Sequence, residues 1–332
     1  MRSLANPYVT PRPRDLEPTD NRVLKRNFRE WSVACALGVL LIFLAIAAPA
    51  FFRRQPLVSL LTREAPTLVV ACGMALVIIC RQIDISVGSQ FAVCSVGAGL
   101  LAAMKWPLAL VLPASIALGA LLGAVNGALV AGLRLPSIVV TLATMVAWRK
   151  ALDWRRQGEF VNLPEGGQWF GLSQSAGQWT LIVTALALLG LLVFATKHLA
   201  AGRFIYAVGS DVEAARLAGL RPQLTTFWVF VFMGALTGLA AMMNVVQSPQ
   251  VDPKSGSGLE LKVIAAAVVG GVAVSGGRGK LWGVFVGLLL LACISPALTH
   301  LHVEAYWEKA IQGTIILLAV VADGWRSRKE KR

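Results

Sequence analysis

Long apolar runs are the feature that most constrains what this chain can fold into. Hydrophobic residues make up 56% of the 332 residues, and charged residues only 14%. Apolar runs of about 15 to 25 residues recur along the sequence, and roughly 20 apolar residues are needed for a helix to cross a bilayer. The chain is therefore predicted to be an all-α, polytopic integral membrane protein.

Prolines, glycines and charges divide the apolar sequence into about ten expected transmembrane helices. These helices are expected at 31–52, 65–80, 87–104, 107–133, 136–152, 179–196, 225–246, 261–275, 281–297 and 306–322. Two of them, 65–80 and 261–275, are too short for a straight crossing and are predicted to be discontinuous. The transmembrane domain, 31–322, is flanked by an N-terminal tail, 1–30, and a basic C-terminal tail, 323–332.

The positions of lysine and arginine indicate the orientation. Both tails are rich in these residues, and cytoplasmic segments of membrane proteins are enriched in Lys and Arg, so both termini are predicted to be cytoplasmic. The exception is the loop at 149–178, which carries Arg149, Lys150, Arg155 and Arg156 and is expected on the outer side of the membrane. The net charge of +14 does not indicate nucleic-acid binding, because the basic residues form no single stripe with interleaved aromatic residues.

The sequence carries no recognisable enzyme or cofactor motif. Gly279-Lys280 is followed by Leu281 and lacks the first glycine of a phosphate-binding loop, so this chain is not expected to bind ATP through such a loop. HExxH and GxSxG motifs are absent, and the five cysteines lie inside apolar runs without metal-ligand spacing. The chain is predicted to be neither an enzyme nor a metalloprotein.

Internal similarities indicate an inverted repeat. Two stretches, Gln82–Ser89 and Gln250–Ser257, are alike and are named here the echo segments. Glycines also recur at four-residue spacing in two helices, which predicts close helix packing; they are Gly119, Gly123 and Gly127, and Gly279, Gly283 and Gly287. Both similarities are five helices apart, so the second copy would run upside down, with helices 2–5 repeated as helices 7–10.

A short polar segment lies between two apolar runs at 209–219. Asp211 or Ser210 can cap a short helix, Glu213 sits in its first turn, and Gly219 ends it. The segment resembles the EAA loop of ABC importer permeases, which forms a coupling helix that docks on the ATPase subunit. The alternative is an ordinary capped loop helix. The candidate coupling residues are Asp211, Glu213, Ala214, Ala215 and Gly219.

Three further stretches resemble the monosaccharide-type ABC permeases, which import ribose, xylose, rhamnose or autoinducer-2 and belong to the branched-chain amino acid and ribose permease superfamily. They are the first echo segment, Leu135–Met145 and Ile264–Gly279. With their surroundings these stretches cover residues 66–323. The chain departs from the family at Arg81-Gln82, where two glycines are usual, and this places a cation near Asp84.

The resemblance implies a permease subunit of an ATP-driven ABC importer in the bacterial inner membrane, carrying a monosaccharide or similar small polyol. It also implies an ATPase subunit that holds ATP and Mg, a substrate-binding protein, and a second permease copy or a paralogue. No cofactor is expected on this chain. The alternative is an ion-coupled secondary transporter, which would need no docking helix but would need a coupling-ion site that the sequence does not reveal.

Several polar residues are candidates for the translocation path or its gate. Asp84 could cap the following helix, pair with Arg81 or face the path, and for Asn126 a bond to a neighbouring helix is favoured over a sugar contact. The candidates for the path or gate are Asp84, Ser86, Gly88, Ser89, Asn126, Thr141, Thr144, Gln247, Gly276 and Gly277. The candidates for docking of the binding protein are Arg149, Arg155 and Arg156, which could equally belong to a solvated loop or anchor the headgroup region.

Overall fold

A computed structural model describes residues 19–164 and 166–301, together with 304, 307, 309–311, 313–314, 317 and 321. The C-terminal tail, most of the N-terminal tail and much of the tenth expected helix lie outside the described residues. The helix α1 already begins at Thr19, inside the segment assigned to the N-terminal tail.

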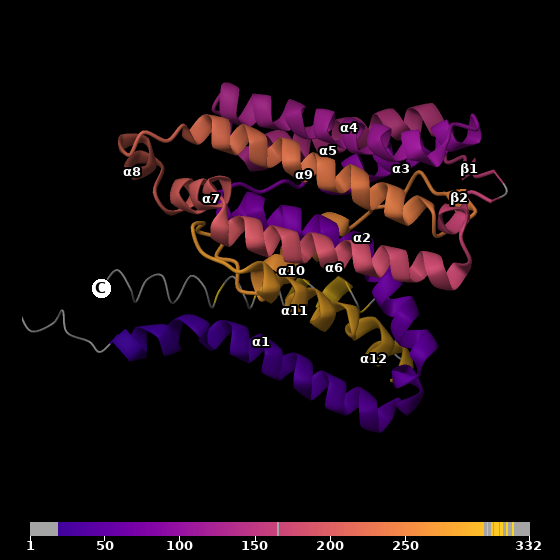
Figure 1. Cartoon of the computed structure of the whole chain (residues 1–332), viewed down its shortest axis with the longest axis horizontal. Helices are drawn as coiled ribbons and strands as arrows, with labels where there is room; N and C mark the ends of the chain where they lie inside the picture. Colours follow the sequence, from indigo (N-terminus) through magenta and orange to yellow (C-terminus); the bar gives the residue numbers. More distant parts are fainter. Residues whose placement is uncertain are drawn as a thin grey trace, which may run out of the picture.

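The described chain is almost entirely helical (Figure 1). Its α-helices are α1 (Thr19–Ala47), α2 (Arg54–Ile79), α3 (Val87–Ala103), α4 (Leu108–Gly127), α5 (Ser137–Arg156), α6 (Gln174–His198), α7 (Ala200–Ser210), α8 (Val212–Leu217), α9 (Pro222–Val245), α10 (Leu259–Val269), α11 (Leu281–Ala292) and α12 (Ile294–His300). Short 3-10 turns lie at Pro49–Phe52 and Gln168–Gly171, and a π-helix, Ala128–Gly132, extends α4. Two-residue strands β1 (Val161–Asn162) and β2 (Gln250–Val251) pair antiparallel.

Five helices among the described residues are long and apolar enough to cross a membrane. They are Arg54–Ile79, Leu108–Gly132, Gln174–His198, Pro222–Val245 and Leu281–Thr299. The prediction of an all-α, multi-pass membrane protein is therefore confirmed. Figure 1 places α7, α8 and the start of α1 at one end of the molecule, and β1–β2 at the other.

The structure corrects three boundaries. The first helix ends at Ala47, just before Pro49, so the expected span to residue 52 is too long. The second is not short: α2 has 26 residues and contains Glu64 and Pro66, which the sequence pattern treats as a break. Helix α5 continues to Arg156, so Arg149 lies on a helix and not in a loop. By contrast, α10 has only 11 residues, about 16 Å, and is short as predicted.

The glycine repeats mark close helix packing, as predicted. A Cβ atom added at Gly119 or Gly123 of α4 would overlap backbone carbonyls of α9, and one added at Gly283 of α11 would overlap the carbonyl of Gly270, just after α10. Backbones can approach this closely only where side chains are missing. Gly279 is different, because it lies in the turn before α11 with a positive φ of 152°.

The helices α3 and α10 start next to each other and run toward opposite ends. Gly88, at the start of α3, lies against Gly256, which precedes α10. Farther along α3, Gly99 lies against Val251 of β2. The turn after α10 instead reaches the C-terminal end of α2, where the Gly277 amide donates to the Ile79 carbonyl (2.8 Å). Both helices therefore begin at a common contact inside the protein.

Candidate functional site

A buried polar network fills the break between α2 and α3. Asp84 is completely buried, and its carboxylate accepts hydrogen bonds from the Ser86 amide (2.9 Å) and from Gln90 Nε2 (2.9 Å). Asn126 of α4 donates to Ser86 Oγ (2.8 Å) and accepts from Thr144 Oγ1 of α5 (2.9 Å). A carboxylate at membrane depth is costly unless it is paired or hydrogen-bonded, and this network supplies the bonds while joining three helices.

Side chains of α5 bond the extended backbone of the same break. Ser137 Oγ accepts from the Ile83 amide (3.2 Å), and Thr141 Oγ1 accepts from the Ile85 amide (3.1 Å). An irregular backbone at membrane depth needs such partners because lipid offers none. The structure thus brings five of the predicted path residues together, namely Asp84, Ser86, Asn126, Thr141 and Thr144.

Sequence reasoning missed two members of this network, Gln90 and Ser137. Each lies four residues from a predicted member, Ser86 and Thr141 respectively, on the same helical segment. That spacing places both members of each pair on one helix face, so it could have indicated that Gln90 and Ser137 join the network.

The structure distinguishes between two of the predicted roles of Asp84, capping α3 and pairing with Arg81. Its carboxylate accepts from the amide two residues ahead, at the entrance to α3, which is a local capping turn. Arg81 does not pair with it among the described residues; Arg81 Nε instead donates to the Ser275 carbonyl (2.8 Å). The predicted Arg81–Asp84 pair is therefore wrong, because Asp84 is enclosed by uncharged donors while Arg81 points to the turn after α10.

The two echo segments share two side-chain hydrogen bonds, although residues 87–89 of the first are helical and Gly256 of the second lies in a turn with a positive φ of 75°. Asp84 and Asp252 each accept from the amide two residues ahead, at 2.9 and 2.8 Å. Ser89 and Ser257 each donate to the carbonyl three residues earlier, both at 2.7 Å. Equivalent positions thus make equivalent hydrogen bonds in two segments that are distant in sequence.

Arg149 joins the two echo segments. Its guanidinium donates to the carbonyls of Pro253 and Ser255 (3.3 Å each) in one segment and of Gly88 (3.1 Å) in the other. In the same contact, a Cβ on Gly88 or Gly256 would overlap the carbonyl oxygen of the other glycine. Arg149, predicted to dock a binding protein, is therefore half-buried and engaged inside the chain.

The polar segment at 209–219 folds into the expected short helix, α8. Asp211 caps it, accepting from the amides of Glu213 (2.9 Å) and Ala214 (3.0 Å). Gly219 follows the helix with φ of +83°, a conformation that glycine adopts without strain. Of the two predicted caps, Asp211 is the one observed.

Helix α8 presents most of its side chains to the outside. Glu213 and Arg216 pair across the exposed surface (2.8 Å), and Leu217 is 87% exposed. Ala215 alone points inward and is buried. An exposed leucine beside charged groups, on a helix at the end of the molecule, is available to a partner surface.

The segment leading into α8 contacts the transmembrane helices closely. A Cβ at Gly209 would overlap the Ile79 carbonyl at the end of α2, and one at Gly277 would overlap Ser210. Tyr206 Oη donates to the Gly279 carbonyl (2.8 Å), and burial raises the pKa of this phenol, which keeps it a donor. Gly276 and Gly277, predicted as gate residues, thus contact the α7–α8 segment and the end of α2 and make no hydrogen bond to the Asp84 network among the described residues.

The remaining candidates lie apart from both clusters. Gln247 follows α9, where its side chain donates to the Met243 carbonyl (2.9 Å). Arg155 is exposed, and Arg156 donates to the carbonyls of Glu159 and Phe160 (3.1 Å each).

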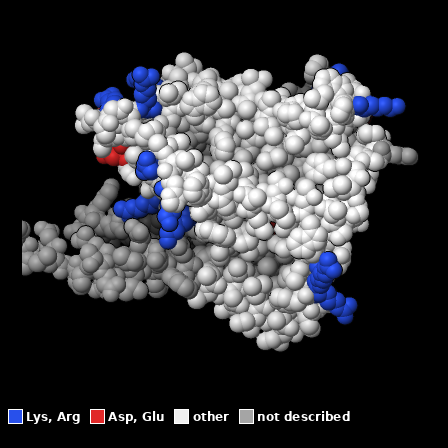
Figure 2. Space-filling view, in the orientation of Figure 1, with Lys and Arg blue, Asp and Glu red and all other residues white. Residues whose placement is uncertain are grey.

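Basic side chains lie toward the ends of the molecule. Figure 2 shows Lys and Arg near the two ends and a broad uncharged band between them on this face. Membrane-crossing helices, a hydrogen-bonded break within them and an exposed helix at one end together define the architecture of a membrane transporter.

Comparison with known proteins identifies the family. A family described as the permease component of branched-chain amino acid transport systems matches residues 56–320. The autoinducer 2 import system permease protein of Enterobacter sp. strain 638 is 34% identical over 91% of this chain and 88% of its own length. The ribose import permease protein of Escherichia coli strain K12 is 32% identical over 87% of this chain and 91% of its own. No solved structure matches.

The chain belongs to this permease family. It is the membrane permease subunit of an ABC importer, and it works with an ATPase subunit and a substrate-binding protein. The predicted resemblance is confirmed, and the permease is favoured over the ion-coupled secondary transporter. The family also makes it a multi-pass inner-membrane protein.

Proposed function

We propose that this chain imports a monosaccharide or a similar small polyol, driven by ATP that is hydrolysed on the partner subunit. The observation that carries the ATP-driven part is α8: it is capped, exposed and placed directly after a segment in close contact with α2 and with the turn after α10. A push on α8 would reach both transmembrane elements through backbone contacts. The polyol follows from the relatives named above, which carry ribose and autoinducer 2 in their descriptions.

We infer that the transmembrane part is an inverted repeat within ten crossings. The equivalent hydrogen bonds of the echo segments support this proposal, as do the helices α3 and α10, which start together and diverge. The start of α1 lies at the α8 end (Figure 1). With α8 facing the ATPase, the N-terminus is cytoplasmic, and an even number of crossings places the C-terminus there too.

We also propose how the predicted path residues act. The Asp84 network closes the first break in this conformation, and movement of α3 relative to α5 would open it, exposing Asn126 and Thr144 to the cargo. A second permease copy or a paralogue would complete the path. Arg155 is exposed and makes no hydrogen bond to the backbone of the described residues, whereas Arg149 and Arg156 do, so Arg155 is the first candidate for contact with the binding protein.

Import into proteoliposomes tests the proposal. The permease, its ATPase and its binding protein are reconstituted, and uptake of D-ribose, D-xylose and L-rhamnose is measured with ATP inside. At least one sugar is expected to accumulate only with ATP, and an ionophore that dissipates ion gradients is expected to leave uptake unchanged. Uptake that survives removal of ATP but stops with the ionophore would instead establish ion coupling.

A further inference from the structure

A cavity of about 530 Å³ lies on the side of the second echo segment, between α2, α3, α9, α10 and α12. Its lining includes Glu64, Lys262, Asn244, Ser257, Ser295 and Phe91. A cavity of this size falls within the range of small-molecule sites in proteins. None of these residues belongs to the Asp84 network or to the α8 region.

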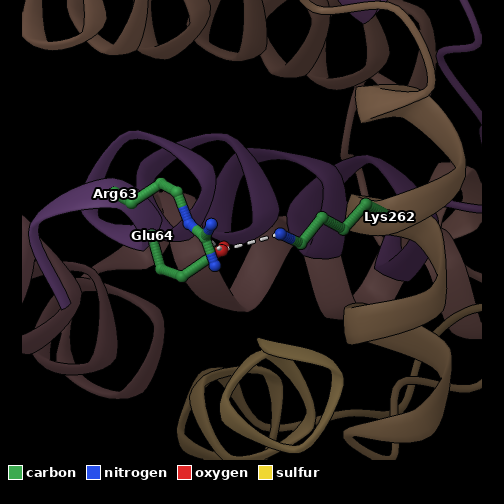
Figure 3. Close-up of polar contacts among 3 residues, drawn as sticks. All are labelled: Arg63, Glu64 and Lys262. Atoms are coloured by element: carbon green, nitrogen blue, oxygen red, sulfur yellow. Dashed lines mark hydrogen bonds and ion pairs between the residues drawn. The ribbon is translucent and has the colours of Figure 1, made fainter. Parts of the chain in front are cut away.

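Glu64 is the unusual group in this cavity. It is only 4% exposed, yet it lies in the middle of an apolar helix. Its Oε1 accepts from Lys262 Nζ of α10 (2.8 Å), and Arg63 Nε is 3.7 Å away from the same oxygen (Figure 3). The other oxygen, Oε2, is buried and has no hydrogen-bond partner among the described residues. A buried carboxylate oxygen without a donor is costly, so a ligand that donates a hydrogen bond there is stabilised.

The charged groups restrict the ligand. Besides Glu64, the cavity is lined by the cations Arg63, Lys262 and Lys309. A cation would be repelled by these three groups, and an anion without a hydroxyl group could not donate to Glu64 Oε2. A neutral molecule with several hydroxyl groups can donate to the carboxylate and accept from an ammonium or amide at the same time. The ring of Phe91 adds an apolar surface against which the carbon face of such a molecule can pack.

The cavity lies away from the ATPase-facing end. Glu64 is in the half of α2 nearer Arg54, whereas the other end of α2 contacts the α7–α8 segment. Gly256 and Ser257, from the second echo segment, line it directly. A ligand held there would contact both α10 and α3, the helix whose Gln90 belongs to the Asp84 network.

We propose that this cavity is a receiving site for the polyol cargo, with Glu64 as hydrogen-bond acceptor and Lys262 and Asn244 as donors. The proposal rests on the proposed function for the identity of the cargo. The site precedes the Asp84 network on the route from the outer side, so it determines which solutes enter the chain after release from the binding protein.

Protection of an introduced thiol tests the site directly. Ser257→Cys places the thiol at the cavity in a Cys35→Ser background, since the other four cysteines are buried. The permease and its ATPase are held in nanodiscs without binding protein, and the rate of labelling by a membrane-impermeant maleimide is measured. D-ribose, D-xylose and L-rhamnose are the probes, betaine controls for osmotic effects, and inorganic phosphate tests an anion.

At least one sugar is expected to slow labelling about threefold, the factor for a ligand present at twice its Kd. Glu64→Gln is expected to remove this protection, whereas Glu159→Gln, which alters an exposed acid outside the cavity, is expected to keep it. Lys262→Met provides a second variant should Glu64→Gln fold poorly, and it is expected to weaken protection as well.

Three results would overturn the site: no protection by any sugar, equal protection in Glu64→Gln, or protection by phosphate alone. ATP-driven import by the unmodified complex is measured in parallel. Import without protection would overturn the receiving site alone. Protection without import would overturn the proposed function and leave a polyol site in place.

Discussion

The two echo segments share two local hydrogen bonds but differ in their backbone and in their surroundings. In the first, Asp84 is fully buried and its neighbours are tied to α4 and α5 through Asn126 and Thr141. In the second, Asp252 is only half-buried, and Ser257 faces the cavity that contains Glu64. The eight-residue pattern therefore accounts for the two shared hydrogen bonds, while the helices around each copy determine whether it closes a break or borders a cavity.

The comparison assigns different roles to the two halves. The first break is held by several hydrogen bonds, so moving it requires these to be broken together, although the buried Gln90 Oε1 has no partner among the described residues. The second borders a cavity with an unpartnered acceptor, so it is ready to accept a ligand. A transporter needs both properties, and here they are divided between two copies of one motif.

The largest expected effect on stability is the difference between substituting Asp84 and substituting Asp252. Asp84→Ala leaves the buried donors of Ser86 and Gln90 without an acceptor, and we expect the free energy of unfolding to fall by about 3 kcal/mol. Asp252→Ala removes one local turn bond, which costs about 1 kcal/mol. Thermal unfolding in nanodiscs measures both variants. Equal losses would show that the two turns are not differently enclosed.

The contact between the echo segments gives the next effect. Gly256→Ala requires a positive φ of 75° and overlaps the Gly88 carbonyl, so we expect a loss of about 3 kcal/mol. Gly258→Ala is the matched control: its φ is 84°, but nothing lies within 4 Å of its added Cβ, so about 1 kcal/mol is expected. The same nanodisc unfolding experiment compares them, and similar losses would argue against a tight contact.

Substitution of Arg149 is expected to have an intermediate effect on stability. Arg149→Gln removes donors to three carbonyls at the echo contact, and we expect about 2 kcal/mol of destabilisation. Arg155→Gln should leave stability unchanged and alter only the salt dependence of uptake, as an exposed docking charge would. Unfolding and uptake at several salt concentrations are measured for both. A stable Arg149→Gln variant with salt-insensitive uptake would return Arg149 to the docking surface.

The smallest stability effect concerns the connection to α8. Tyr206→Phe removes one hydrogen bond to the Gly279 carbonyl, which costs about 1 kcal/mol. The ATPase should still bind because α8 is unchanged, but less sugar should enter per ATP hydrolysed. The ratio of uptake to hydrolysis in proteoliposomes measures this coupling. An unchanged ratio would remove Tyr206 from the connection.

Much of the fold could be predicted because apolar runs report directly on membrane helices. The short α10, the glycine contacts of α4 and the Asp211 cap of α8 each follow from a local pattern. The start of α2 could not be predicted in this way. Arg63, Glu64 and Pro66 look like a break, and the closest partner that stabilises the carboxylate inside that helix is Lys262, 198 residues away in the sequence.

The candidate site was predicted as a list of residues but not as an arrangement. Five polar positions do meet around Asp84, since spacing along helices indicates shared faces. The contacts of Gly276 and Gly277 with α2 and the α7–α8 segment depend on where the turn after α10 packs, which no local pattern encodes. The role of Arg149 likewise depends on backbone carbonyls from two distant segments.

The central claim, that α8 is the contact for the ATPase, is tested most directly by co-purification. Glu213→Lys reverses an exposed charge on α8, while Glu159→Lys makes the same change near β1, at the opposite end. The account predicts that the ATPase co-purifies with the unmodified permease and with Glu159→Lys but is lost from Glu213→Lys, with all three proteins folded in the membrane. Full recovery of the ATPase with Glu213→Lys, or equal loss from both variants, would contradict it.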